Sequence, residues 1–371
     1  MKIAVCTRHI GSKSLTGGDR FVTHCFRALV QHDRSNQYIG YHESLGQWGL
    51  AHGLPLSMLS LLSDAVLKNM WIPLWARKNQ VDLFLHLIPP ICYTESKIPQ
   101  VCSIFDVPQG WEQSNLLDRA YNRLFNQWSA RSANQLTTIS HYSKEIIMRL
   151  YAVPEAKVSV VYPCIDLDGF NPKAKMDPAQ HAVLAAANAT QGYVLGVISR
   201  IIERKNPGAY FEIYARLPGE MRDKHKLVIV GAGSGLADFK PFVPGEILDR
   251  VKQDVVFLGH VPNNIAGIYA KAGVVLFPSR YEGFGLPVIE AMACATPIVA
   301  SDIPAIAEAS GRNIPLFNPD DWAGMAEYCE MLLEDQKAAA ATKERCSAWV
   351  QQFSYAEYAR RMNAVLQACI R

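Results

Sequence analysis

The chain has 371 residues, of which 49% are hydrophobic and 19% are charged, and its formal net charge is +3. That length is too great for one ordinary core and fits about two domains. The small net charge argues against a nucleic-acid partner, which usually needs a strongly basic face. Nine cysteines are scattered without metal-ligand spacing, so we expect reduced, buried thiols.

The chain begins with MKIAVCTRHIG, which we interpret as a strand and a turn. We do not expect a signal peptide, because this segment lacks the long apolar stretch of one. The sequence has no run of about 18 uncharged apolar residues, so we predict no membrane span. The expected compartment is therefore the cytoplasm.

Short apolar runs alternate with amphipathic helical patterns in the first half of the chain. This alternation is typical of parallel sheets covered by helices. We expect Asp19 to cap the first helix and Ser143 the fourth. Strands are predicted at 2–5, 37–41, 82–87, 101–105, 135–139 and 158–162, and helices at 19–31, 57–78, 114–133 and 143–151.

The second half of the chain repeats this rhythm. Strands are predicted at 193–199, 226–230, 255–258, 273–277 and 297–300, and helices at 206–216, 264–272, 287–294, 320–334 and 336–352. The polar, alanine-rich segment 171–192 is predicted to be a linker. We therefore expect an α/β protein with two doubly wound domains, whose ligands bind in a cleft at the carboxyl ends of both sheets.

A glycine-rich turn follows the strand predicted at 273–277, in the segment PSRYEGFGLPVIEAM. Pro287 suits a first helical position, and the free N–H groups beside it would bind phosphate. Gly283 and Gly285 permit unusual backbone angles and close ligand approach. Glu282 and Glu290 are eight residues apart in the sequence, so they can grip two parts of one elongated ligand.

This turn resembles the E-x7-E motif of retaining glycosyltransferases with the two-domain GT-B fold, family 4 in particular. In that family the first glutamate contacts the donor sugar and the second binds the ribose of the nucleotide. The resemblance implies these roles for Glu282 and Glu290, and it places Gly283, Phe284, Gly285 and Leu286 in the same site. The alternative is an ordinary turn with two surface glutamates.

Two cations follow the first strand of the second half, in the segment GVISRIIERKNP. This segment resembles the G-R-x4-K-N-P segment of the family, in which Arg200 and Lys205 match the cations that hold the donor diphosphate. Fixed cations stabilise the charge that grows on the departing nucleoside diphosphate. We expect these side chains to replace a metal ion, and we expect no cofactor.

Weaker resemblances extend from about residue 1 to the C-terminus. Gly17 and Gly18 match the glycine-rich first loop of the family, and Val261 belongs to the turn that meets the nucleotide base. The resemblance implies an acceptor-side domain at 1–173 and a nucleotide-sugar domain at 190–352. The final helix, 355–371, is expected to pack back on the first domain.

One departure from the family pattern lies in the first domain. Many relatives carry His-Asp after the fourth strand, where this chain has Phe105 and Asp106. We expect Asp106, His86 or His9 to take over the function of the missing histidine, and we include Asp106 with Arg200, Lys205 and Glu282 among the catalytic residues.

The expected function is metal-independent, retaining transfer of a hexose, mannose or glucose, from a sugar nucleotide. The acceptor would be a saccharide or a lipid-linked saccharide of the cell envelope or of an exopolysaccharide. Apolar and basic side chains at 57–78 and 114–133 could rest on a membrane, or they could be core faces with solvated edges.

Several alternatives stay open. The segment GAGSG at 231–235 suggests a dinucleotide-binding dehydrogenase, although Leu236 stands where a third glycine is expected. Glu282 and Glu290 could be the acid and base of a glycosidase. A sugar-nucleotide epimerase, or a binding protein without catalysis, would have the same fold.

Overall fold

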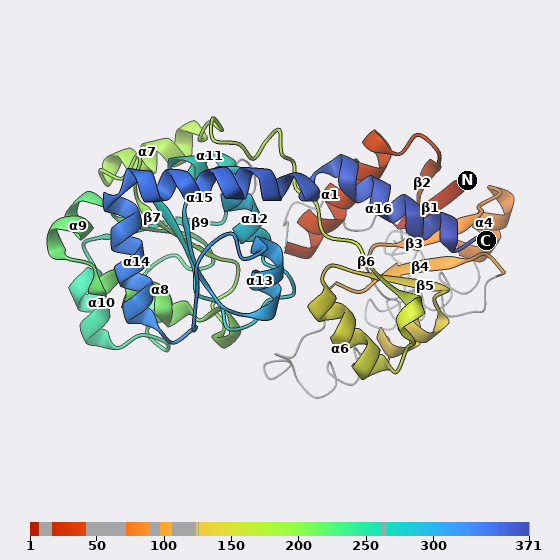
Figure 1. Ribbon diagram of the computed structural model, residues 1–371, viewed down its shortest axis with the longest axis horizontal. Coiled ribbons are helices and arrows are strands. Elements are labelled where there is room, and N and C mark those ends of the chain that lie inside the picture. The colour runs from red at the N-terminus through yellow and green to blue at the C-terminus, as the bar shows by residue number, and fades with distance from the viewer. Residues whose placement is uncertain are drawn as a thin grey trace, which may run out of the picture. The chain divides into compact units, whose positions relative to one another are not determined.

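The computed structural model describes residues 1–6, 17–41, 72–88, 97–105, 124, 126–261 and 265–370 (Figure 1). The chain divides into two compact units, Met1–Cys164 with Tyr355–Arg371, and Ile165–Ser354. The segment 171–192, predicted as a linker, is part of the second unit and contains helix α7, Pro178–Ala186. Asp177 caps this helix by accepting a hydrogen bond from the Ala179 N–H, and Pro178 is its first residue, so the sequence carries a helix start signal here.

A six-stranded parallel sheet forms the centre of the first unit, in the order β2-β1-β3-β4-β5-β6. The strands are short and β3 and β4 are wholly buried, as expected where helices cover both faces of a parallel sheet. Their bounds are β1 Lys2–Cys6, β2 Gln37–Tyr41, β3 Leu83–His86, β4 Gln100–Ser103, β5 Gln135–Thr138 and β6 Val158–Val160. Each predicted strand of this half is therefore confirmed, with small shifts at its ends.

The helices of the first unit differ from the prediction mainly at their starts. The helix predicted at 143–151 begins two residues earlier, because Ser140 rather than Ser143 caps it and accepts a hydrogen bond from the Ser143 N–H at 2.9 Å. The first helix begins at Gly17, so Asp19 lies inside it and is no cap. The bounds are α1 Gly17–His32, α4 Ile72–Lys78, α6 His141–Tyr151, the 3₁₀ turn η3 Glu155–Lys157 and α16 Tyr355–Ala368. Most of the segments predicted as helices at 57–78 and 114–133 lie outside the described residues.

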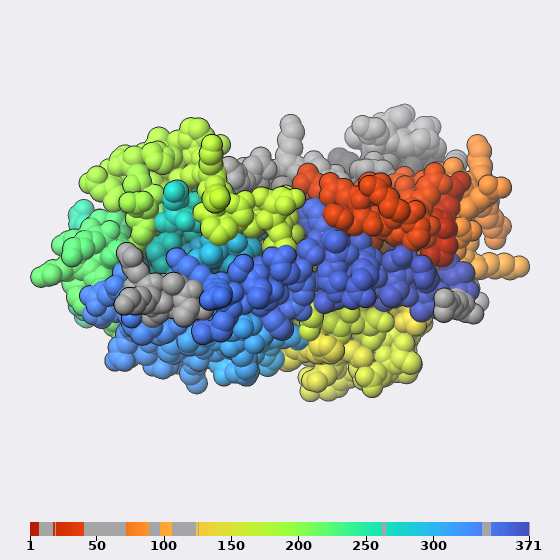
Figure 2. All heavy atoms as spheres, turned by 45° about the horizontal axis from the view of Figure 1, so that its top comes forward, coloured from red at the N-terminus to blue at the C-terminus, as the bar shows by residue number. Residues whose placement is uncertain are grey.

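Helix α16 lies alongside α1 in the first unit, and both the ribbon and the space-filling view show this contact (Figures 1 and 2). Buried residues of α16, among them Tyr358 and Met362, form its apolar face. Asn363 of α16 accepts a hydrogen bond at 2.9 Å from Asn36, which lies between α1 and β2. The last helix of the sequence thus completes the first unit.

The second unit also contains a six-stranded parallel sheet, in the order β12-β11-β10-β7-β8-β9. Numbered along the chain within the unit, this order is 3-2-1-4-5-6 when read from β9, which is the classic order of the Rossmann fold. The bounds are β7 Val194–Ile198, β8 Leu227–Gly231, β9 Val255–Gly259, β10 Val274–Phe277, β11 Ile298–Ser301 and β12 Leu316–Phe317. Only the two-residue β12 is absent from the sequence prediction.

Helices cover the second sheet. Buried side chains of α8, α10 and α14 share one cluster with alternate residues of the strands, whereas α12 contacts β10 and β11. The bounds are η4 Glu203–Lys205, α8 Pro207–Arg216, α9 Gly219–Lys224, η5 Leu236–Phe239, α10 Gly245–Val251, α11 Ala266–Lys271, α12 Leu286–Ala293, α13 Pro304–Ser310, α14 Trp322–Glu334, α15 Gln336–Trp349 and η6 Val350–Phe353. Among the helices of the described ranges, none is both long and apolar enough to cross a bilayer.

Candidate functional site in the second unit

The second sheet reverses its strand order between β7 and β10, which are hydrogen-bonded neighbours. The chain leaves β7 toward one side of the sheet and returns to β10 on the other side. In doubly wound folds, ligands bind at the carboxyl ends of the strands at such a point. The loops that follow β7 and β10 contain Lys205 and Glu282, so the topology brings both residues to this position.

Lys205 and Glu282 form a buried ion pair. The Lys205 Nζ donates to both carboxylate oxygens of Glu282, at 2.6 and 2.7 Å, although the two residues are 77 positions apart. Only 14% of the lysine side chain and 9% of the glutamate side chain are exposed. A guanidinium nitrogen of Arg204 lies 3.9 Å from the same carboxylate. The two groups that were predicted to hold different parts of a donor therefore hold each other.

Backbone hydrogen bonds join the two loops around this pair. The carbonyl oxygen of Arg204 accepts from the N–H groups of Arg280 and Tyr281, at 2.9 and 3.2 Å. Asn206, with a φ of 49°, donates from its side chain to the carbonyl oxygens of Pro278 and Pro319, both at 3.1 Å. These bonds fix the backbone on either side of the ion pair, so the position of Lys205 against Glu282 is built into the fold.

Glu290 lies in α12 and is buried. Its carboxylate accepts a hydrogen bond from the Tyr269 hydroxyl of α11 at 2.8 Å. Burial, together with the negative charge of Glu290, raises the pKa of the Cys294 thiol to about 12. Tyr269 thus orients a buried carboxylate, whose charge is screened less than it would be at the surface.

The glycine-rich turn adopts a left-handed conformation where glycine permits it. Gly285 has a φ of 105° and immediately precedes α12, whose second residue is Pro287. The Phe284 ring is buried against Phe353, with ring centroids 5.6 Å apart, so it anchors the turn from behind. Gly283 and Leu286 are half-buried beside it. The phenylalanine ring is therefore packed inside the unit and is closed to a ligand.

The remaining predicted residues of the second unit are less enclosed. Arg200 is exposed two residues after β7, and its guanidinium makes no hydrogen bond or ion pair with any residue that the structure describes. Val261 is buried just beyond β9. Arg200 is therefore the cation of this site that is available to an incoming anion, whereas Lys205 is already paired.

In the first unit the predicted residues are only partly described. Gly17 and Gly18 form the start of α1. Asp106 and His9 lie outside the described residues. His86 is buried in β3, where its Nε2 lies 3.2 Å from the Gln100 Oε1, so it packs within the sheet.

Phe105, which stands where many family members have histidine, packs against Phe21 of α1. The two ring centroids are 4.7 Å apart. The substitution therefore replaces a polar group by a contact between two aromatic rings, and it joins the end of the fourth strand to the first helix.

Three residues of the site were not predicted from the sequence: Arg204, Tyr269 and Tyr210. Burial, followed by the charge of Glu282, raises the pKa of Tyr210 far above its ordinary value. Arg204 lies between Glu203 and Lys205 in the loop, and its sequence position gives a signal. Tyr269 gives none, because its role depends on the packing of α11 on α12.

The segment GAGSG at 231–235 follows β8 and not β7, the first strand of the unit. A dinucleotide-binding fingerprint belongs in the turn after the first strand. Gly231, with a φ of 111°, lies so close to β7 that a Cβ atom on it would be 2.2 Å from the Ile198 carbonyl oxygen. Gly231 therefore serves close packing of the loop against β7. In the described parts of the chain, no three His, Cys, Asp or Glu residues are grouped to hold a metal ion.

Comparison with known structures assigns the fold to the GT-B class, with two Rossmann-like doubly wound domains. HepE from Anabaena, crystallised with UDP and glucose, matches 99% of this chain and 100% of its own with a TM-score of 0.73 at 18% identity. O-antigen chain mannosyltransferase B of Escherichia coli is 29% identical over 76% of this chain and 73% of its own length. RfbU, an O-antigen chain mannosyltransferase of Salmonella typhimurium, is 27% identical, and the match spans 65% of each chain.

Two family models match successive parts of the chain. The model described as Glycosyltransferase Family 4 matches residues 27–168, and that described as Glycosyl transferases group 1 matches residues 192–335. The chain belongs to the family 4 glycosyltransferases, and it is a nucleotide-sugar-dependent glycosyltransferase. A dehydrogenase or a glycosidase is accordingly ruled out.

Proposed function

We propose that this enzyme transfers a hexose, mannose or glucose, from a nucleoside diphosphate sugar to a saccharide or lipid-linked saccharide of the cell envelope, with retention and without a metal ion. The observation that carries the proposal is the group of Arg200, Lys205 and Glu282 at the strand-order reversal of the second sheet. Two cations and one carboxylate at the expected position of a donor suit a ligand with a diphosphate and a hydroxyl-rich ring.

Each residue has a separate part in this proposal. Arg200 and Lys205 bind the diphosphate, and they stabilise the charge that grows on it as the bond to the sugar breaks. Glu282 accepts hydrogen bonds from sugar hydroxyls, and Glu290 accepts them from the ribose diol. Lys205 can serve both partners, because its three N–H donors allow a phosphate oxygen to bind while Glu282 remains attached.

The relatives support the choice of sugar and acceptor. The Escherichia coli and Salmonella typhimurium proteins are mannosyltransferases of O-antigen chains by name, and HepE was crystallised with UDP and glucose. We therefore place this chain in cell-envelope or exopolysaccharide assembly, with mannose as the first donor to test and glucose as the second.

We propose a reaction on one face of the sugar ring. The acceptor hydroxyl oxygen forms a bond to the anomeric carbon while the bond from that carbon to the diphosphate oxygen breaks. The hydroxyl proton passes to the departing phosphate oxygen, so no covalent enzyme intermediate is needed. Proton NMR of the product tests retention, because the anomeric coupling constant must match that of the donor. Activity should persist in EDTA.

We propose cytoplasmic location with peripheral contact to a membrane that carries the acceptor. Leu124 and Trp128 are 65% and 52% exposed, and the basic Arg131 is exposed in the same segment of the first unit. Exposed Trp and Leu beside a basic residue suit the interface of an anionic membrane. Sedimentation with anionic vesicles should capture the protein, and Trp128→Ser should weaken capture. Equal sedimentation of both proteins would remove this surface from the proposal.

The donor is identified by thermal unfolding with UDP, GDP, ADP and their sugars. A nucleotide at a hundred times its Kd stabilises the folded chain by about 2.7 kcal/mol. Transfer or slow donor hydrolysis distinguishes the enzyme from a protein that only binds the nucleotide, an alternative prompted by Phe105. Interconversion of free donors without transfer would indicate an epimerase. No response to any nucleotide would overturn the proposal.

A further inference from the structure

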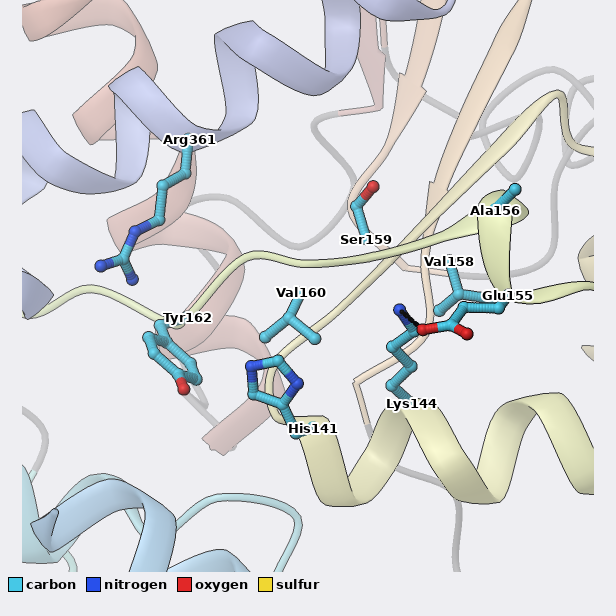
Figure 3. Close-up of a pocket in the computed structure, with 9 residues that line it drawn as sticks. All are labelled: His141, Lys144, Glu155, Ala156, Val158, Ser159, Val160, Tyr162 and Arg361. Carbon is cyan, nitrogen blue, oxygen red and sulfur yellow. Dashed lines mark hydrogen bonds and ion pairs between the residues drawn. The ribbon is translucent and has the colours of Figure 1, made fainter.

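A pocket lies wholly within the first unit, between α6, β6 and α16 (Figure 3). Its volume is about 540 Å³, within the range of small-molecule sites. It contains none of the residues assigned to the donor. Its wall combines the guanidinium of Arg361 with the rings of Tyr162 and His141.

Arg361 brings the positive charge to this pocket. Its Nε donates to the Glu357 Oε1 at 2.8 Å, and both oxygens of Glu357 also accept from Arg360. Two guanidinium groups thus share one carboxylate, which leaves a net charge of +1. The Arg361 Nη1 and Nη2 atoms make no hydrogen bond with any described residue. That edge of the guanidinium suits two oxygens of a phosphate or carboxylate.

Aromatic rings form the neighbouring wall. The Arg361 guanidinium carbon lies 5.0 Å from the centre of the Tyr162 ring, and Figure 3 shows the arginine reaching from α16 toward that ring. The His141 ring meets Tyr162 edge-on, with centroids 6.2 Å apart. The contact with Tyr162 holds the guanidinium in place, and a flat ring beside a fixed cation suits a sugar that carries an anionic group.

The other polar groups of the pocket are compatible with such a ligand. The Lys144 Nζ is paired with the Glu155 carboxylate at 3.1 Å, so these two charges offset each other. Ser159 lies in β6, which is an edge strand of the sheet. An edge strand offers backbone N–H and C=O groups that sugar hydroxyls can bind. The excess positive charge of the pocket therefore comes from Arg361.

We propose that this pocket binds a sugar that carries a phosphate or a carboxylate, with the anionic group on Arg361 and the ring against Tyr162. The site shares no residue with the proposed donor site. The proposal does not depend on which sugar the enzyme transfers.

Calorimetric titration of the full chain without nucleotide tests the proposal. The probes are glucose 6-phosphate and glucuronate, with neutral glucose and inorganic phosphate for comparison. At least one anionic sugar should bind saturably, and about ten-fold more tightly than glucose or phosphate, because only it uses both the cation and the ring. The preferred anionic sugar then distinguishes phosphate from carboxylate.

Variants locate the binding. Arg361→Ala should weaken binding of the anionic sugar about ten-fold or more, the value of a lost charge-assisted bidentate contact. Arg360→Ala is the matched control, because Arg360 pairs with the same Glu357 but is not part of the pocket wall. Because its removal takes away one charge but leaves the Arg361 guanidinium in the pocket wall, Arg360→Ala should weaken binding much less than Arg361→Ala. Tyr162→Ala should reduce the affinity for the sugar but not that for inorganic phosphate.

Four results would overturn the proposal. They are no saturable binding of either anionic sugar, equal losses in the Arg361 and Arg360 variants, an unchanged affinity in Tyr162→Ala, and displacement of the sugar by a nucleoside diphosphate. The last would place the probe in the donor site. Thermal unfolding must show that each variant is folded, and Arg361→Gln replaces Arg361→Ala where it is not.

Discussion

Replacing Lys205 with methionine is the sharpest test of how the second unit is held together. Methionine keeps most of the apolar stem and removes the charge, so Glu282 loses both of its short hydrogen bonds. The carboxylate is 9% exposed, and among the described residues it would keep only Arg204, at 3.9 Å, as a nearby cation. Removing one partner of a buried pair costs about 3–5 kcal/mol. Because Arg204 can compensate in part, we expect about 3 kcal/mol.

The exposed pair of Arg280 and Asp320 provides the control. It joins the loop after β10 to a neighbouring turn, and its side chains are 39% and 62% exposed. Exposed pairs contribute about 0–1 kcal/mol. Arg280→Met should therefore cost far less than Lys205→Met. Urea unfolding, with hydrogen exchange in β7 and β10 to identify the transition of the second unit, measures both.

A double-mutant cycle separates the pair from its surroundings. Glu282→Gln, Lys205→Met and the double variant should give a coupling free energy of about 2 kcal/mol. Lys205→Met should also lower turnover by about 10²–10³ through the lost stabilisation of the leaving group, with a much smaller loss of donor affinity. If Lys205→Met cost no more stability than Arg280→Met, the buried pair would not contribute to folding. A normal turnover would place the diphosphate elsewhere.

Further expected outcomes concern Glu290 and Gly231. Glu290→Gln should weaken nucleotide binding about ten-fold, as measured by calorimetry, because a carboxylate is the stronger acceptor for a ribose diol. Tyr269→Phe should weaken it less, since the hydroxyl only orients the carboxylate; unchanged affinity in both variants would remove the ribose role. Gly231→Ala should destabilise the second unit by at least about 2 kcal/mol, because its φ of 111° and the nearby Ile198 carbonyl oxygen leave no room for a Cβ atom. Gly235→Ala, with open space around the position, is the control, and equal urea midpoints for the two variants would contradict the packing argument.

The strands were predictable because burial on both faces of a parallel sheet leaves a continuous apolar run in the sequence. The two-residue strand β12 is too short to give such a run. Helices α9 and α10, six and seven residues long, are likewise too short to show a helical period. The cap of α6 was misplaced by three residues because Ser140 and Ser143 are both good caps, and only the backbone geometry distinguishes them.

The site was predictable as a set of residues and not as a set of contacts. Sequence reasoning placed Lys205 and Glu282 after separate strands and gave each its own ligand. Their direct pairing depends on β7 and β10 being neighbours, which follows from the order of strands across the whole unit. Tyr269 and Glu290 likewise come together through the packing of two helices. Local sequence patterns do not encode contacts that form only when the sheet is assembled.

The pairing of Lys205 with Glu282 changes how the loop after β7 is to be understood. A lysine near the start of a helix is unfavourable because of the helix dipole. From the sequence alone, binding of a phosphate explains why a lysine is placed there. The structure supplies a second reason, because the same ammonium neutralises a carboxylate that is 9% exposed. Lys205 is therefore held in place before any donor arrives, while the exposed Arg200 keeps its conformational freedom. A donor diphosphate would thus meet one cation whose position is fixed by folding and one whose side chain must be ordered on binding, at a cost of about 0.5–1.5 kcal/mol.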